Sequence, residues 1–131
     1  MNPILVTQKI VILNAENKIL SIRRSKTDPT RPLSWDVPGG LVDEGEDLVK
    51  SILREVKEEV GIEVSRPELI DAFSFKSESG ECLICIGYKA IAISHDVTLS
   101  YEHDKFEWLT KDEFLQRDSK NHVRQLVSLC L

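Results

Sequence analysis

Three glutamates, Glu55, Glu58 and Glu59, are spaced so that a single helix face would carry all of them. They occur within residues 47–60, where apolar residues recur every three or four positions and predict a helix. At about 100° per residue, positions i, i+3 and i+4 spread over about a third of the helix circumference. Like charges at this spacing repel, and hard cations such as Mg²⁺ prefer oxygen ligands. On a single helix, this pattern by itself fits a solvated acidic face better, and a divalent metal site is the alternative.

The acidic residues are concentrated around these glutamates. The 131-residue chain carries 17 Lys and Arg against 22 Asp and Glu, which gives a net charge of −5. Residues 40–62 hold 7 acidic and 3 basic residues, whereas residues 1–39 hold 6 basic and 3 acidic residues. An acidic total disfavours a nucleic-acid partner. A short, dense acidic block directly after a basic segment is a feature that the fold or the function has to explain.

The segments around the glutamates predict an α/β domain with a mixed sheet. Strands are expected at residues 4–13, 18–23, 68–76, 81–93 and 106–109. Helices are expected at residues 47–60, 111–117 and 121–131. The apolar stripe of the first helix would comprise Val49, Ile52, Leu53, Val56 and Val60. Gly61 suits a left-handed C-cap, and Thr110 with Glu113 forms a capping box. We expect one domain over residues 1–131, with helices covering both faces of its sheet.

Two segments between these elements lack regular periodicity. Residues 24–35 contain Pro29 and Pro32 and predict a long loop, which in a small domain is usually functional or disordered. Pro38-Gly39-Gly40 predicts a tight turn where another backbone or a ligand comes close.

Composition narrows the class of protein further. A hydrophobic content of 41% is that of a globular protein, and no stretch reaches the roughly 20 apolar residues of a membrane helix. We see no signal peptide, and three cysteines argue against a disulfide framework, so a cytoplasmic location is expected. Cys82 and Cys85 fall in a predicted strand and would point to opposite faces. They are expected to be buried, inert thiols rather than zinc ligands.

The acidic block also matches a longer pattern at nine specified positions. The matching residues are Gly40, Glu46, Arg54, Glu55, Val56, Glu58, Glu59, Gly61 and Ile62. Their types and spacing resemble the Nudix box of the Nudix hydrolases. Trp35-Asp36-Val37-Pro38-Gly39-Gly40 and the pair Glu102-His103 ahead of Phe106-x-Trp108 resemble the same family. The resemblance implies a single Nudix domain, an α/β/α sandwich with a mixed sheet.

The resemblance implies Mg²⁺-assisted hydrolysis, with Mn²⁺ as a substitute, of a nucleoside diphosphate linked to another group. By motif position, the metal ligands would be Glu55, Glu58, Glu59 and the backbone carbonyl of Gly39. Glu58 and Glu59 are thereby expected catalytic residues, and Gly40 would lie beside the substrate. Arg54 would pair with Glu46 and orient the helix. Clustered carboxylates fit this chemistry, because phosphoryl transfer needs charge neutralisation and an in-line water more than a covalent nucleophile.

A general base is expected outside the box. Glu102 is the first candidate, since it matches the family's Glu-His pair, and Asp104 and Glu107 are alternatives. Each could equally be a surface carboxylate.

Basic and aromatic side chains supply candidates for substrate binding. Arg24 and its neighbour Arg23 are expected to contact phosphate, because a guanidinium matches phosphate oxygens. Lys26 and Arg31 fit a solvated charge run at least as well. Aromatic residues that would stack on a base, or else belong to the core, are Trp35, Phe75, Tyr88 and Trp108. His103 is expected near the site.

The expected substrate is a small-molecule nucleotide. By its small size and lack of an extra domain, the chain resembles Nudix members that convert a nucleoside triphosphate, damaged or undamaged, to monophosphate and pyrophosphate. Three other enzyme substrates stay open: nucleotide sugars, dinucleoside polyphosphates and RNA 5′ ends. A non-catalytic nucleotide-sensing Nudix module is the remaining alternative. No membrane partner is expected, and a homodimer is an expected state because dimers are common in the family.

Overall fold

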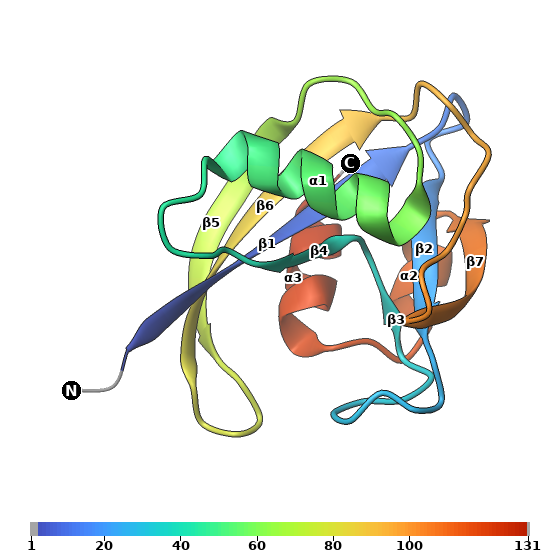
Figure 1. Cartoon of the computed structure of the whole chain (residues 1–131). Helices are drawn as coiled ribbons and strands as arrows, with labels where there is room; N and C mark the ends of the chain where they lie inside the picture. The colour runs from blue at the N-terminus through green and yellow to red at the C-terminus, as the bar shows by residue number, and fades with distance from the viewer. Residues whose placement is uncertain (1–2, 131) are drawn as a thin grey trace.

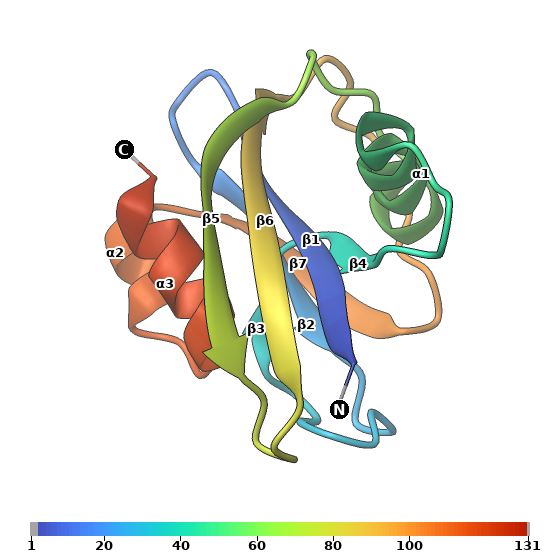
Figure 2. The same ribbon diagram turned by 90° about the vertical axis from the view of Figure 1, so that its left-hand side faces the viewer.

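The computed structural model describes residues 3–130, whose strands form one seven-stranded mixed sheet. The strands are β1 (Ile4–Leu13), β2 (Ile19–Arg24), β3 (Trp35–Asp36), β4 (Gly39–Leu41), β5 (Glu68–Lys76), β6 (Cys82–Ile91) and β7 (His103–Leu109). The helices are α1 (Leu48–Val60), α2 (Lys111–Leu115) and α3 (Asn121–Leu129). Helix α1 covers one face of the sheet, and α2 and α3 cover the other (Figures 1 and 2). The predicted α/β/α arrangement is confirmed.

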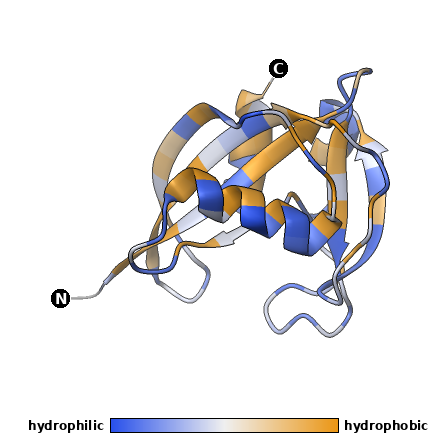
Figure 3. Ribbon diagram, turned by 45° about the horizontal axis from the view of Figure 1, so that its top comes forward, coloured by the Kyte–Doolittle hydropathy of each residue, from blue (hydrophilic) through white to orange (hydrophobic). Residues whose placement is uncertain are grey.

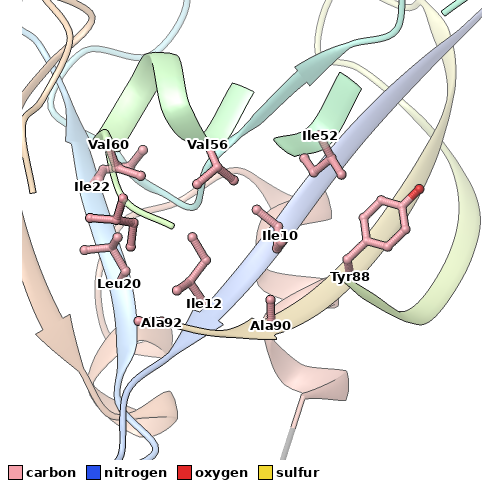
Figure 4. Close-up of a cluster of buried hydrophobic side chains, with 11 residues drawn as sticks. Ile10, Ile12, Leu20, Ile22, Ile52, Val56, Val60, Tyr88, Ala90 and Ala92 are labelled. Carbon is pink, nitrogen blue, oxygen red and sulfur yellow. The ribbon is translucent and has the colours of Figure 1, made fainter. Parts of the chain in front are cut away.

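Strand β1 divides the interior into two hydrophobic cores, because successive strand side chains point to opposite faces. Ile10 and Ile12 face α1 and pack with β2, β6 and the helix, as Figure 4 shows. Val11 and Leu13 join the second core. Its other members include Phe114 of α2 and Val123, Leu126 and Val127 of α3. Among the named strands of residues 3–130, β1 and β6 are the one parallel pair, with ten register pairs from Ile4↔Cys82 to Leu13↔Ile91.

Helix α1 begins and ends where its sequence signals predicted. Asp47 is its N-cap residue, and Gly61 ends it with φ 68°, donating from its N–H to the carbonyls of Val56 and Lys57. Its apolar side faces the sheet and its charged side faces outward (Figure 3). The buried residues of α1 are Ser51, Ile52, Val56, Glu59 and Val60. Leu53, which the sequence assigns to the apolar stripe, is 38% exposed, whereas Glu59 is buried.

The sheet opens between β1 and β2, which share the single register pair Leu13↔Ile19. Beyond this pair, β4 adds to β1 and β3 adds to β2. β3 lies at the end of the long loop predicted at residues 24–35, and β4 lies at the predicted Pro38-Gly39-Gly40 turn. Gly39 lies so close to β1 that a Cβ there would overlap the backbone carbonyl of Gln8. Where β1 and β2 diverge, Thr7 and Lys9 of β1 and Arg24 of β2 line a cavity.

Two other predictions needed correction. The strand expected at 106–109 begins earlier, at His103, because residues 103–109 pair along β2. Cys85 is buried as predicted, but Cys82 is exposed, because it stands at the first position of β6, at the end of the sheet. Within residues 3–130, no helix is long and apolar enough to cross a membrane.

Candidate active site

A cavity of about 890 Å³ collects most of the candidate residues, and its size suits a nucleotide. Its carboxylates are Asp36, Glu55, Glu58, Glu59, Glu78, Glu81 and Glu102. Its cationic and imidazole side chains are Lys9, Arg24, Lys76, Lys120, His103 and His122. Helix α1 supplies the box glutamates from one face of the sheet, and α3 begins beside the cavity from the other (Figure 2). Both predicted glycines, Gly39 and Gly40, also line it.

Glu59 is the most buried of the three glutamates of α1, with 6% of its surface exposed. Its carboxylate accepts a hydrogen bond from the backbone N–H of Gly39 at 3.1 Å. Burial raises the pKa of Glu59 to about 8, although Lys9 and the Gly39 N–H oppose the change. Burial also raises the pKa of Glu55, and the charges of Glu58 and Glu102 act in the same direction. Nearby positive charges and hydrogen-bond donors therefore do not fully offset the cost of ionising Glu55 and Glu59 at this site.

Arg54 is placed between the loop before α1 and the glutamates of the helix. It donates to Glu46 at 3.0 Å and to both carboxylate oxygens of Glu58 at 3.2 Å. Glu46 also accepts from the backbone N–H of Asp43 at 2.8 Å, which ties the loop to the helix. The ion pair expected between Arg54 and Glu46 is present, and Arg54 is absent from the lining of the cavity.

The donor set fits a hard divalent cation in its chemistry. Glu55, Glu58 and Glu59 offer only oxygen atoms, and the raised pKa values of Glu55 and Glu59 show that a cation would be favoured beside them. Within residues 3–130, no three acidic, histidine or cysteine side chains converge on one point as metal ligands. The carboxylate of Glu58 instead pairs with Arg54 at 3.2 Å, and its side chain is 57% exposed.

The three candidate bases lie in different surroundings. Glu102 lines the cavity, close enough that its charge raises the pKa of Glu55. Asp104 forms two hydrogen bonds with Arg23, at 2.9 and 3.1 Å. Glu107 forms ion pairs with Arg117 at 3.0 Å and with Lys105 at 3.3 Å. Of the three, Glu102 alone is among the residues that line the cavity.

The two neighbouring arginines of β2 have separate environments, as consecutive strand residues point to opposite faces. Arg24 lines the cavity and donates to Asp36 at 2.9 Å and to Asp28 at 2.9 Å. Arg23 pairs with Asp104 and does not line the cavity. The contact expected between Arg23 and phosphate stays a prediction, which the pairing of Arg23 with Asp104 outside the cavity does not support.

Sequence reasoning missed the buried ion pair beneath Arg24. Asp36 has 3% of its side chain exposed and accepts from the ammonium of Lys9 at 3.0 Å, from Arg24 and from the Val37 N–H at 2.8 Å. Lys9 is itself 7% exposed and lines the cavity. Lys9 was the one sign of this ion pair in the sequence, because it is a charged residue inside the apolar strand Ile4–Leu13.

Among the aromatic candidates, Phe75 alone lines the cavity, where its ring stacks on His122 with centroids 4.3 Å apart. Trp35 lies under the guanidinium of Arg117, and the hydroxyl of Tyr88 donates to Gln8 at 2.7 Å. Trp108 packs beside His95. These three contribute to packing rather than to the cavity.

Comparison with known proteins agrees with this geometry. The MutT NUDIX hydrolase of Burkholderia pseudomallei has a similar structure, with a TM-score of 0.86 and 26% identity, covering 99% of this chain and 100% of that one. A MutT-like protein of Streptomyces ambofaciens is 25% identical over 117 residues, 89% of this chain and 71% of the relative. The uncharacterized Nudix hydrolase YvcI of Bacillus subtilis (strain 168) is 32% identical over 73 residues, which is 56% of this chain but 43% of the relative.

The sequence model of a protein family, the NUDIX domain, matches residues 4–130, which is nearly the whole chain. The match includes the box glutamates, the glycine strand β4 and Glu102. The chain therefore belongs to the NUDIX domain family.

Proposed function

We propose that the protein is a Mg²⁺-dependent hydrolase of nucleoside diphosphate derivatives, which converts a nucleoside triphosphate to a monophosphate and pyrophosphate. The observation that carries the proposal is the pair Glu55 and Glu59, two partly desolvated carboxyls with raised pKa values in a cavity that fits a nucleotide. Family membership supports the reaction class. A cytoplasmic location and a homodimer stay predictions.

The proposed metal ligands are Glu55, Glu58, Glu59 and the carbonyl of Gly39. A bound Mg²⁺ would neutralise charge on phosphate oxygens and lower the pKa of water, and Mn²⁺ would serve in the same way. Arg54 and Glu46 would act as positioning residues, since their ion pair fixes α1 against the preceding loop. Glu59 is fixed by its hydrogen bond from the Gly39 N–H.

Glu102 is the proposed general base. Its carboxylate would orient a water molecule and accept a proton as the water oxygen attacks phosphorus and the bridging P–O bond breaks. Arg24 would bind phosphate oxygens, because its guanidinium lines the cavity and is fixed there by Asp36 and Asp28. Gly40 would allow close approach, since a Cβ at this position would lie 3.0 Å from the carboxylate of Glu55.

A nucleotide panel assayed for phosphate and pyrophosphate release with and without Mg²⁺ tests the function. The panel contains nucleoside triphosphates, nucleotide sugars, dinucleoside polyphosphates and 5′-triphosphorylated RNA, which separates the alternative substrates. Glu59→Gln should abolish turnover, whereas the matched control Glu63→Gln, an exposed residue beyond α1, should retain it. A Glu59→Gln variant with the wild-type rate would refute the site. Binding of nucleotides without turnover of any compound would favour a sensing module.

The assignment of the base has its own test. Glu102→Gln should lower kcat by about 10²–10⁴, whereas Glu107→Gln should leave kcat within about twofold of wild type, because Glu107 pairs with Arg117 outside the cavity. Equal rates for wild type and Glu102→Gln would remove Glu102 from the mechanism.

A further inference from the structure

Three cations that line the cavity, Lys9, Arg24 and Lys120, form a cationic cluster whose members differ in their carboxylate partners. Asp36 contacts both Lys9 and Arg24, and Asp28 contacts Arg24. Lys9 and Arg24 therefore each have a carboxylate in ion-pair contact. Lys120 differs from the other two cations, since its ammonium forms no ion pair with a carboxylate within residues 3–130. It donates instead to the hydroxyl of Thr30 at 3.2 Å.

Lys120 is held at a fixed place by a chain of hydrogen bonds. Its partner Thr30 donates to Asp28 at 3.1 Å, and Asp28 accepts from Arg24 at 2.9 Å. Lys120 is also the N-cap residue of the nine-residue helix α3, and its side chain does not cap that helix. The half-buried ammonium lines the cavity, and burial lowers its pKa. A desolvated cation at a helix N-terminus is an environment that favours an anion.

An independent observation at the same cavity points to a ligand. His103 is 92% buried and lines the cavity, and its Nδ1 has no hydrogen-bond partner within the described residues. It lies opposite Arg24 in the pairing of β2 and β7. Buried polar atoms are nearly always satisfied in folded proteins, so this Nδ1, which has almost no exposed surface of its own, is an unmet hydrogen-bonding position beside the cavity.

We propose that Lys120, with Arg24 and His103, forms a subsite for a phosphate group that the substrate carries in addition to the diphosphate that is cleaved. This deepens the proposed function and rests on it. The glutamates of α1 would serve the scissile diphosphate, and the cationic cluster would bind the additional phosphate. Two sources share this chemistry: the terminal phosphate of a nucleoside triphosphate, and a phosphate on the ribose. The subsite selects phosphate-bearing substrates over those whose second moiety is uncharged.

Hydrolysis of four compounds that contain the same adenosine diphosphate unit tests the selection. ATP is compared with ADP-glucose for the terminal phosphate, and NADP⁺ with NAD⁺ for the ribose phosphate. Lys120→Met should reduce kcat/KM for the phosphate-bearing member of the preferred pair by about 10-fold or more relative to its uncharged counterpart, through a higher KM. Lys120→Arg should restore most of the ratio. Lys26→Met, an exposed lysine outside the cavity, is the matched control.

Binding of tripolyphosphate to metal-free protein, measured by isothermal titration calorimetry, is independent of turnover. Wild type and Lys26→Met should bind it, and Lys120→Met should bind about 10-fold or more weakly. If Lys120→Met binds as tightly as wild type and leaves both substrate ratios unchanged, the subsite is refuted. If wild type hydrolyses none of the compounds but tripolyphosphate binding still depends on Lys120, the proposed function fails and the anion subsite stands. Circular dichroism confirms that each variant is folded.

Discussion

The buried carboxylate of Asp36 offers the sharpest test of how the cavity is held together. Replacing Asp36 with asparagine keeps the shape of the side chain and removes its charge. Lys9 and Arg24, with side chains 7% and 23% exposed, would then lose the anion that they share. The two cations contact Asp36 at 2.9 to 3.2 Å. They also hold the pKa of this carboxyl far below its usual range, against the effect of burial.

Removing one partner of a buried ion pair costs about 3–5 kcal/mol, since the other charge stays buried and uncompensated. We expect Asp36→Asn to lower the free energy of unfolding by this amount. For a chain of this size, about 4 °C per kcal/mol gives a fall in Tm of about 12–20 °C. Asp104→Asn is the matched control, because the pair Asp104 and Arg23 is about a third exposed. Such exposed pairs contribute about 0–1 kcal/mol.

Urea denaturation at pH 7, followed by circular dichroism, measures both variants against wild type. A loss below about 1 kcal/mol for Asp36→Asn, equal to that of Asp104→Asn, would refute the reasoning that the buried network is held by charge. A large loss at Asp36 alone would support it. Lys9→Met in the Asp36→Asn background should recover part of the stability, because it removes one of the stranded cations.

Three further predictions concern other parts of the fold. Burial lowers the pKa of His103 from 6.5 to about 4, so stability should decrease as pH falls through this interval, and His103→Gln should flatten the dependence in urea titrations. Gly87→Ala should lower stability by about 1–3 kcal/mol, because its Cβ would overlap Leu126, and a wild-type Tm would contradict this packing. A thiol reagent should modify exposed Cys82 rapidly and buried Cys85 only on unfolding, and mass spectrometry after Cys82→Ser checks the assignment.

Local sequence signals predicted the elements that carry the box. The apolar spacing of α1 and the left-handed Gly61 depend on interactions within a few residues, so the sequence was sufficient to locate that helix. The capping box of α2 was predicted for the same reason and is present. Strands β3 and β4 were missed, since segments of two and three residues have too little periodicity and are extended only because β2 and β1 supply their hydrogen-bond partners.

The candidate site divides in the same way. The sequence by itself determined the family, the glutamates of α1 and the pairing of Arg54 with Glu46, because these residues follow one another along a single helix and its adjoining loop. Only the tertiary structure decided that Glu102 rather than Asp104 or Glu107 lines the cavity, that Arg24 faces it and Arg23 does not, and that Asp36 sits between two cations. Those outcomes depend on contacts between residues far apart in sequence, and on a strand's alternation of faces once its register is fixed. Such long-range contacts leave no local pattern in the sequence. The positions of Lys9 and Lys120 in the cavity therefore depend on how β1, β2 and α3 pack around it, and the sequence alone did not predict them.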